Sequence, residues 1–110
     1  MANTFTRKVS RNVGASATQV GSYTVGAAAS ATVIGMTVCN TTGNAITVDV
    51  YHYDGANATY LVKAAPINVG GTLVPVGGDQ KLVLITGDSV YVQSSAATSV
   101  DVVMSVLEIT

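Results

Sequence analysis

The sequence predicts an all-β protein: a single-domain antiparallel β-sandwich of jelly-roll type, with about eight strands and an extended N-terminal arm. Three observations predict this class. Val, Ile and Thr are frequent in the strand-like segments, these segments alternate apolar with polar residues, and Gly, Asn and Asp turns separate them at intervals of about 8–12 residues. At 110 residues the chain can bury one core without disulfides. We expect an arm over residues 1–19 and a sandwich over residues 20–110.

Charge is scarce in this chain. Charged residues make up 10% of it, against about 25% in ordinary soluble domains, and such a surface is typical of a subunit that neighbours cover. The formal net charge of −1 provides no basic field, so nucleic acid is not an expected partner. The sequence has no hydrophobic signal segment and no apolar run of membrane length. We therefore expect no membrane partner, and a protein that stays in the cytosol until it joins an assembly.

The first segment is polar and basic. It holds three of the five basic residues of the chain: Arg7, Lys8 and Arg11. Phe5, Val9 and Val13 are spaced like one face of a helix, but the neighbouring Thr and Gly residues are poor helix formers. An extended arm or edge strand is therefore favoured. We expect Phe5 and the three bases to contact another protein.

Ala31–Asn40 is the first long predicted strand, after a shorter one at Val20–Val25. Strict alternation would place Val33 and Met36 on opposite faces of it. The cluster Asn40-Thr-Thr-Gly-Asn44 is a strong turn signal. It predicts an antiparallel hairpin between Ala31–Asn40 and the strand that follows.

The stretch from Ala45 to Tyr53 has the clearest strand pattern. One face carries Ile46, Val48, Val50 and His52, and the other carries Thr47, Asp49, Tyr51 and Tyr53. This pattern is typical of a half-buried strand. Asp54-Gly55 ends it, and Thr59–Ala64 is expected to return as its partner, with Pro66 ending that partner or confining it to a sheet edge.

The remaining chain predicts four short strands between turns at Gly70-Gly71, Gly77-Gly78 and Gly87-Asp88. These strands are Thr72–Val76, Lys81–Ile85, Ser89–Ser94 and Val100–Ile109. The last strand is apolar along one face, and its other face becomes apolar at Leu107 and Ile109. A strand with two apolar faces needs cover on both, from a loop or from a neighbouring subunit, so Leu107 and Ile109 are candidate contact residues.

Few residues could support catalysis or bind a metal. His52 is the single histidine and Cys39 the single cysteine, and their separate strands do not suit a nucleophile–base pair or a zinc site. We expect His52 to be a hydrogen-bonded residue at the rim of the apolar face. The scattered aspartates match no calcium-loop pattern. The sequence therefore predicts no enzymatic activity, no catalytic or metal-binding residues and no cofactor.

Tyr51, Tyr53 and Tyr60 fall on one predicted hairpin. They could form an exposed aromatic surface that contacts a protein or a glycan. They could equally pair across the strands, where aromatic residues pack well on an antiparallel ladder. Both interpretations remain open from sequence.

Several stretches carry a family resemblance. They are Val33-Ile-Gly-Met-Thr-Val-Cys-Asn-Thr-Thr42, Ile46-Thr-Val-Asp-Val-Tyr51, Tyr60-Leu-Val-Lys-Ala-Ala-Pro-Ile67, Gly78-Asp-Gln-Lys-Leu-Val-Leu84, Gly87-Asp-Ser-Val-Tyr-Val92 and Ser99-Val-Asp-Val-Val-Met-Ser-Val-Leu-Glu108. Together they resemble small all-β virion proteins encoded among the structural genes of tailed bacteriophages. The resemblance implies a structural protein present in many copies and without enzymatic activity.

This resemblance, the low charge and the last strand with two apolar faces together lead us to expect a location in a virion. We expect a capsid decoration or cement protein that is made in the host bacterial cytoplasm and stabilises the assembled shell. Its partners would be copies of itself, grouped as trimers, and the major capsid protein or another virion protein. The alternative is a component of the tail, neck, baseplate or fibre, with or without a host-glycan-binding role.

Overall fold

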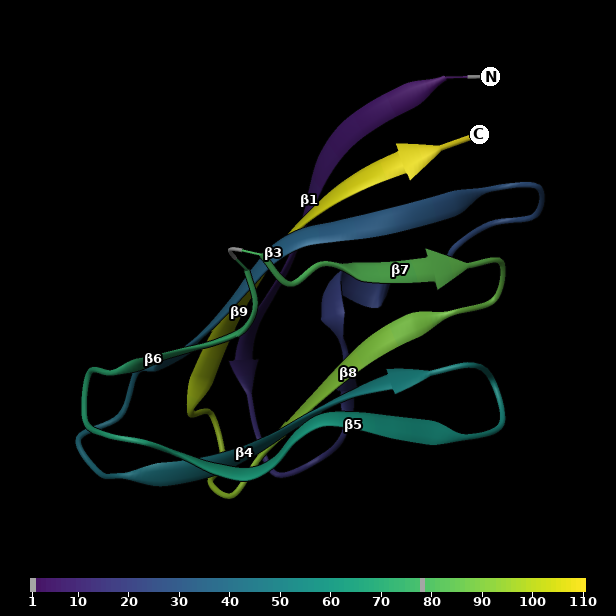
Figure 1. The fold of residues 1–110 in the computed structure, drawn as a ribbon. Coiled ribbons are helices and arrows are strands. Elements are labelled where there is room, and N and C mark those ends of the chain that lie inside the picture. The colour runs from purple at the N-terminus through teal and green to yellow at the C-terminus, as the bar shows by residue number, and fades with distance from the viewer. Residues whose placement is uncertain (1, 78) are drawn as a thin grey trace.

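The computed structural model describes residues 2–77 and 79–110. In it, two antiparallel sheets pack face to face (Figure 1). Sheet A has the order β1-β9-β3, with β6 and β7 both paired to the far side of β3, and sheet B has the order β2-β8-β4-β5. The strands are β1 Asn3–Val13, β2 Thr18–Gln19, β3 Ser30–Asn40, β4 Ile46–Tyr53, β5 Ala58–Ile67, β6 Thr72–Val76, β7 Leu82–Ile85, β8 Ser89–Ser94 and β9 Val100–Ile109. The predicted all-β sandwich is confirmed. Gly78, from the predicted Gly77-Gly78 turn, lies outside the described residues.

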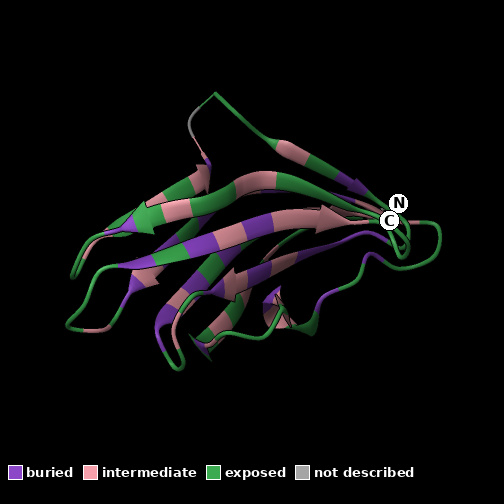
Figure 2. Ribbon diagram, turned by 90° about the horizontal axis from the view of Figure 1, so that it is seen from below, coloured by how far each residue is buried: buried purple, intermediate pink, exposed green. Residues whose placement is uncertain are grey.

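Alternation buries one face of each sheet between the two layers, and Figure 2 shows buried residues interleaved with exposed ones along the strands. In β9 the buried side chains are those predicted: Val100, Val102, Met104 and Val106. Valine is the commonest residue of the core, because β-branched side chains suit the pleated surface of a sheet. The core therefore lies between the sheets and leaves two outer faces.

A β-bulge in β3 changes which residues face the core. Val33 pairs with Val106, but Gly35 pairs with Ser105, so Ile34 is an extra residue on the β3 side. Val33 and Met36 are consequently both buried. The prediction that they lie on opposite faces is wrong, because the bulge reverses the alternation after Val33.

The predicted hairpin between the strand at Ala31–Asn40 and the next strand is also wrong. β3 belongs to sheet A and β4 to sheet B, so the connection crosses from one sheet to the other. The buried Asn40 side chain holds this crossing. Its Nδ2 donates to the carbonyls of Asn44 at 2.8 Å and Ile67 at 3.1 Å, and its Oδ1 accepts from the Thr42 amide at 2.9 Å. The turn signal was real, but turn chemistry alone does not specify which strands pair.

The strand predicted at Val20–Val25 is a short 3₁₀ turn, η1 (Val20–Ser22), followed by irregular chain. Val20 and Val25 are buried and belong to the core. Gly21 has φ +59°, and an added Cβ there would lie 2.6 Å from the Cβ of Lys8. Glycine is therefore required where this turn crosses β1.

The N-terminal residues form the edge strand β1, which runs antiparallel to β9 from the Asn3–Ile109 pair to the Ser10–Val102 pair. Ala2 and Thr110 exchange two backbone hydrogen bonds, so the two ends of the described chain lie side by side (Figure 1). On the other sheet, β5 is an edge strand and contains Pro66, as the missing N–H of proline requires.

Candidate interaction surfaces

The outer side of sheet A collects most of the exposed large apolar side chains of the described chain. We call it the aliphatic face. It is defined by the exposed residues Phe5, Val9, Val74, Val83, Ile85 and Val103 and the half-buried residues Ile34, Leu107 and Ile109. The strand register aligns these residues in rows across the sheet. One row runs through Phe5, Leu107, Thr32 and Val83, and the next runs through Asn3, Ile109, Ser30 and Ile85.

Exposure on the aliphatic face is high for apolar side chains. Phe5 is 76% exposed, and Val83 and Ile85 are each 63% exposed. No loop of the described chain covers them. Of the two kinds of cover considered from sequence, a loop or a neighbouring subunit, the loop is therefore not present in the described chain. Contiguous exposed apolar surface of this kind usually marks an interaction site.

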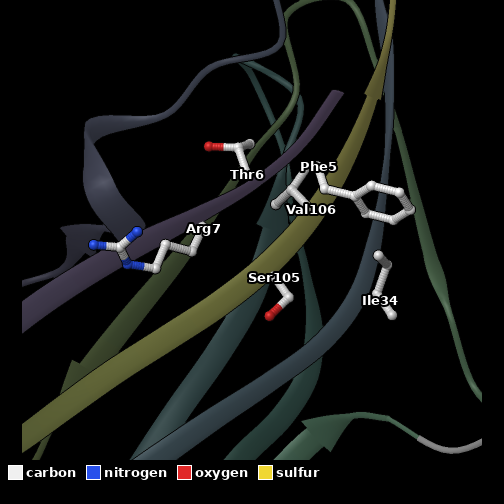
Figure 3. Close-up of a pocket in the computed structure, with 6 residues that line it drawn as sticks. All are labelled: Phe5, Thr6, Arg7, Ile34, Ser105 and Val106. Atoms are coloured by element: carbon white, nitrogen blue, oxygen red, sulfur yellow. The ribbon is translucent and has the colours of Figure 1, made fainter. Parts of the chain in front are cut away.

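A shallow hollow of about 360 Å³ lies where β1, β9 and β3 meet on this face. It is lined by Phe5, Thr6, Arg7, Ile34, Ser105 and Val106. Figure 3 shows the ring of Phe5 reaching across β9 toward Ile34. The bulge at Ile34 places this side chain on the outer side of the sheet, beside Phe5 and away from the core.

The three N-terminal bases lie in three different environments. Arg7 pairs with Ser105 in the register and is exposed on the aliphatic face. Lys8 lies on the opposite side of β1, with Nζ 4.6 Å from the ring centre of Tyr23. Arg11 is exposed beside the register shift between Ser10 and Val13. Lys8 therefore does not share a face with Arg7, and the three bases do not form one basic patch.

Tyr23 connects this edge of sheet A to the core. Its hydroxyl donates a 2.7 Å hydrogen bond to Oε2 of Glu108 in β9. Burial of the ring raises the pKa of the Tyr23 hydroxyl well above its usual value, and the bond to the Glu108 carboxylate and its negative charge raise it further. The neutral phenol is thus the form that the fold stabilises.

The outer side of sheet B is different in chemistry. We call it the tyrosine face and define it by Tyr51, Tyr53, Tyr60 and Tyr91. Tyr51 stacks on Tyr91 with ring centres 5.5 Å apart and an angle of 4°, and it contacts Tyr60 at 5.1 Å. Tyr53 meets Tyr91 edge to face at 5.4 Å. The cross-strand pairing considered from sequence is therefore present, and Tyr60 still keeps 45% of its surface exposed.

A polar hollow of about 260 Å³ continues the tyrosine face along β4. It is lined by Thr47, Asp49, Lys63, Ala64, Gln93, Ser94 and Ser95. Oδ1 of Asp49 accepts the Ala64 amide at 2.7 Å, where Ala64 has φ +51° and the β4–β5 register shifts. This bond holds the irregular part of β5 against β4, so that Lys63 lies 3.8 Å from Asp49 and 4.4 Å from the Tyr60 ring centre.

Sequence reasoning missed several residues of both surfaces. Tyr91 stood alone in its predicted strand, and only the pairing of β8 with β4 brings it to Tyr51. The strand at Lys81–Ile85 was predicted without assigning its faces, and Leu84 alone among β7 residues is fully buried, which leaves Val83 and Ile85 exposed. The signal that could have found them is the alternation within Leu82–Ile85, which predicts that one pair faces outward.

His52 and Asp88 form a polar contact at the edge of the core. Nε2 of His52 lies 2.9 Å from Oδ2 of Asp88, which also accepts the Ile85 amide. His52 is thus a hydrogen-bonded residue at the rim of the core, as predicted, and Cys39 lies in the other sheet. No group of three or more His, Cys, Asp or Glu side chains that could hold a metal ion occurs in residues 2–77 and 79–110. Within the same residues, no helix has the length and apolar character needed to cross a membrane.

A solved pilus structure shares this fold. It comes from Bacillus endospore appendages, described as a novel family of disulfide-linked pili, and the match covers 100% of this chain and 91% of that chain with a TM-score of 0.54. The sequence identity is 16%, so the likeness shows the fold alone. No family model matches the chain, and no curated protein matches it.

Proposed function

We propose that this chain is a non-enzymatic structural subunit of a bacteriophage virion, where it decorates the assembled capsid. The single observation that carries the proposal is the aliphatic face, which the chain leaves uncovered and which another protein surface would bury. The sequence stretches that resemble phage virion proteins support the virion location. The similar fold of a pilus protein supports a role in an assembly.

The mechanism that we propose is stabilisation by linkage. A protein that binds only the assembled shell shifts the equilibrium toward assembly. Copies of this chain, grouped as trimers and joined to the major capsid protein, would bury the rows of Phe5, Leu107 and Val83. Full burial of one such side chain contributes about 1.5–3 kcal/mol, and several per subunit are needed to offset the cost of association.

The first test is the number of copies in purified particles, measured by quantitative mass spectrometry against the major capsid protein. Amounts close to those of the capsid protein are expected. A few copies per particle would assign the chain to the tail, neck, baseplate or fibre. Complete absence would overturn the virion role.

Two matched substitutions test the aliphatic face. Val83 on this face is 63% exposed, and Val69 in the β5–β6 loop is 59% exposed. Val83→Ser should lower particle occupancy about tenfold, because apolar contact is lost, whereas Val69→Ser should leave occupancy unchanged. Point substitutions are preferable to removing β1, whose loss would uncover the edge of β9. Equal occupancy for both variants would contradict a contact through the aliphatic face.

A further inference from the structure

The outer side of sheet B combines aromatic and polar groups in one continuous strip. Along β4 the outward residues are Thr47, Asp49, Tyr51 and Tyr53, and across to β8 Asp49 pairs with Gln93 and Tyr51 pairs with Tyr91. Outward residues of a strand are about 6.7 Å apart, so this strip is about 20 Å long. The tyrosine face occupies one end and the polar hollow the other. We propose that the strip binds a neutral hexose oligosaccharide, an activity beyond the structural role.

The aromatic end offers both faces and hydroxyls to a ligand. Tyr60 is 45% exposed, and its ring lies beside that of Tyr51 at 5.1 Å. None of the four tyrosine hydroxyls has a hydrogen-bond partner among residues 2–77 and 79–110. A pyranose ring presents an apolar C–H face and a rim of hydroxyls, so tyrosines can contact its face through the rings and its rim through their own hydroxyls.

The polar end supplies hydrogen-bonding groups without net charge. Asp49 uses Oδ1 for the Ala64 amide and keeps Oδ2 toward Lys63 at 3.8 Å. Gln93 donates through Nε2 to the Ala15 carbonyl at 2.8 Å, and its Oε1 remains an acceptor. Because Asp49 and Lys63 compensate each other, the hollow favours a neutral polyhydroxylated ligand over an anion such as nucleic acid.

A protein partner fits this strip less well than a sugar does. Protein interfaces have an apolar centre with a polar rim around it, whereas here the polar groups form a separate hollow at one end of the strip. The apolar surface that a protein partner would bury lies on the other sheet. Exposed tyrosines can nevertheless contact proteins, so a protein contact is an outcome that the test must distinguish.

Titration with hexose oligomers tests the proposal directly. The chain has five tyrosines and no tryptophan, so tyrosine fluorescence reports mainly on this face. We would add maltohexaose, cellohexaose and laminarihexaose, each up to millimolar concentrations, and follow fluorescence and amide NMR shifts of the full chain. At least one oligomer should give saturable shifts confined to β4, β5 and β8.

Variants locate the binding and separate its parts. Tyr60→Ala should weaken binding about tenfold through loss of the aromatic contact. Tyr60→Phe, which keeps the ring and removes the hydroxyl, should weaken it less. Phe5→Ala on the aliphatic face is the matched control and should leave binding unchanged. NMR spectra of each variant without sugar confirm that the fold is intact.

Three results would overturn the proposal. The first is that none of the three oligomers gives a saturable shift. The second is that the shifts lie on sheet A. The third is that Tyr60→Ala binds as tightly as the unsubstituted chain. If the amide signals of β4 and β5 change with protein concentration in the absence of sugar, the tyrosine face is a contact between copies of the chain and not a glycan site.

Discussion

The two outer faces of the sandwich solve the same physical problem in different ways. Each sheet has an outward side that the core cannot cover. On sheet B the tyrosine rings are long enough to stack on side chains of adjacent strands, about 4.8 Å away, and they partly bury one another. On sheet A the outward apolar side chains other than Phe5 are Val, Ile and Leu, which are too short to cover a neighbouring strand.

The difference shows which face depends on another molecule. The outer side of sheet B has internal partners for its rings and its charges, such as the Tyr51–Tyr91 stack and the Asp49–Lys63 pair. On the aliphatic face Phe5 lies beside Ile34, yet its ring remains 76% exposed. Sheet A therefore gains more than sheet B from burial in an assembly, whereas sheet B is already organised as a free surface.

The strongest test of this contrast uses neighbouring residues on opposite sides of β9. Met104→Ala should lower the free energy of unfolding by about 3 kcal/mol, because it leaves a cavity in the core. Val103→Ala, on the aliphatic face, should cost less than about 0.5 kcal/mol in the isolated chain. Urea denaturation of both variants measures the two values. A similar cost at both positions would mean that the chain itself already covers the outer side of sheet A.

A second test concerns Tyr23, which is buried on the inner side of sheet A. Tyr23→Phe removes the hydrogen bond to Glu108 and should cost about 1.5 kcal/mol near neutral pH. Denaturant unfolding of the variant measures this loss. No change at neutral pH would mean that the Tyr23–Glu108 bond does not contribute to stability.

Alkaline pH gives the same residues a distinct signature. Burial raises the pKa of Tyr23 in the folded state, with added effects from Glu108, and burial also raises the pKa of Tyr51, with added effects from the neighbouring tyrosines and Asp49. A raised folded pKa means that stability is complete below the unfolded value of 10.0 and is lost as pH rises above it. The free energy of unfolding should therefore be lower at about pH 11 than at neutral pH. Tyr23→Phe should reduce this decrease without abolishing it, because Tyr51 remains. An equal fall in the variant would exclude Tyr23 as a contributor.

A third test measures how far the tyrosine face supports itself. The stacked pair Tyr51 and Tyr91 should show a coupling of about 0.5–1.5 kcal/mol in a double-mutant cycle with alanine. Tyr60, the most exposed of the four, should contribute less to stability when replaced by alanine. A coupling near zero would mean that the rings are neighbours without stabilising each other, and the contrast between the two faces would weaken.

The strand pattern was predictable from sequence because burial alternates with period two. Val100–Ile109 and Ser89–Ser94 have the predicted bounds, and the core side of β9 is the predicted one. Strict alternation missed the bulge at Ile34, although the isolated Gly35 beside it is a local sign of a bulge. Strand partners were also hidden. The turn at Asn40–Asn44 marks a change of direction, but the side chain of Asn40 also binds Ile67 of β5, which is distant in sequence.

The candidate surfaces were also predictable only in part, because alternation places residues within one hairpin but does not identify distant strand partners. Tyr51, Tyr53 and Tyr60 share one hairpin, so local alternation already placed them together. Tyr91 joins them only through the pairing of β4 with β8, which is a long-range contact. On sheet A, the sequence indicated Phe5, Leu107 and Ile109, whereas Val83 depends on the pairing of β7 with β3. Residues joined by tertiary pairing, unlike those joined by a turn, need the fold to be known.

The smallest expected effect concerns the turn that joins β4 to β5 and so brings Tyr60 to Tyr51. Oδ1 of Asp54 accepts the amides of Asn57 at 2.7 Å and Ala56 at 2.9 Å, and these bonds lower the pKa of the Asp54 carboxyl. A lowered folded pKa contributes stability that is present above the unfolded value of 3.8 and is lost as pH falls through the folded value. Asp54→Ala should therefore be slightly less stable than the unsubstituted chain at neutral pH, and the difference should shrink in acid. Thermal unfolding across this pH range measures it. A difference that stays constant with pH would show that the carboxylate does not hold the turn, and that strand pairing alone aligns the tyrosine face.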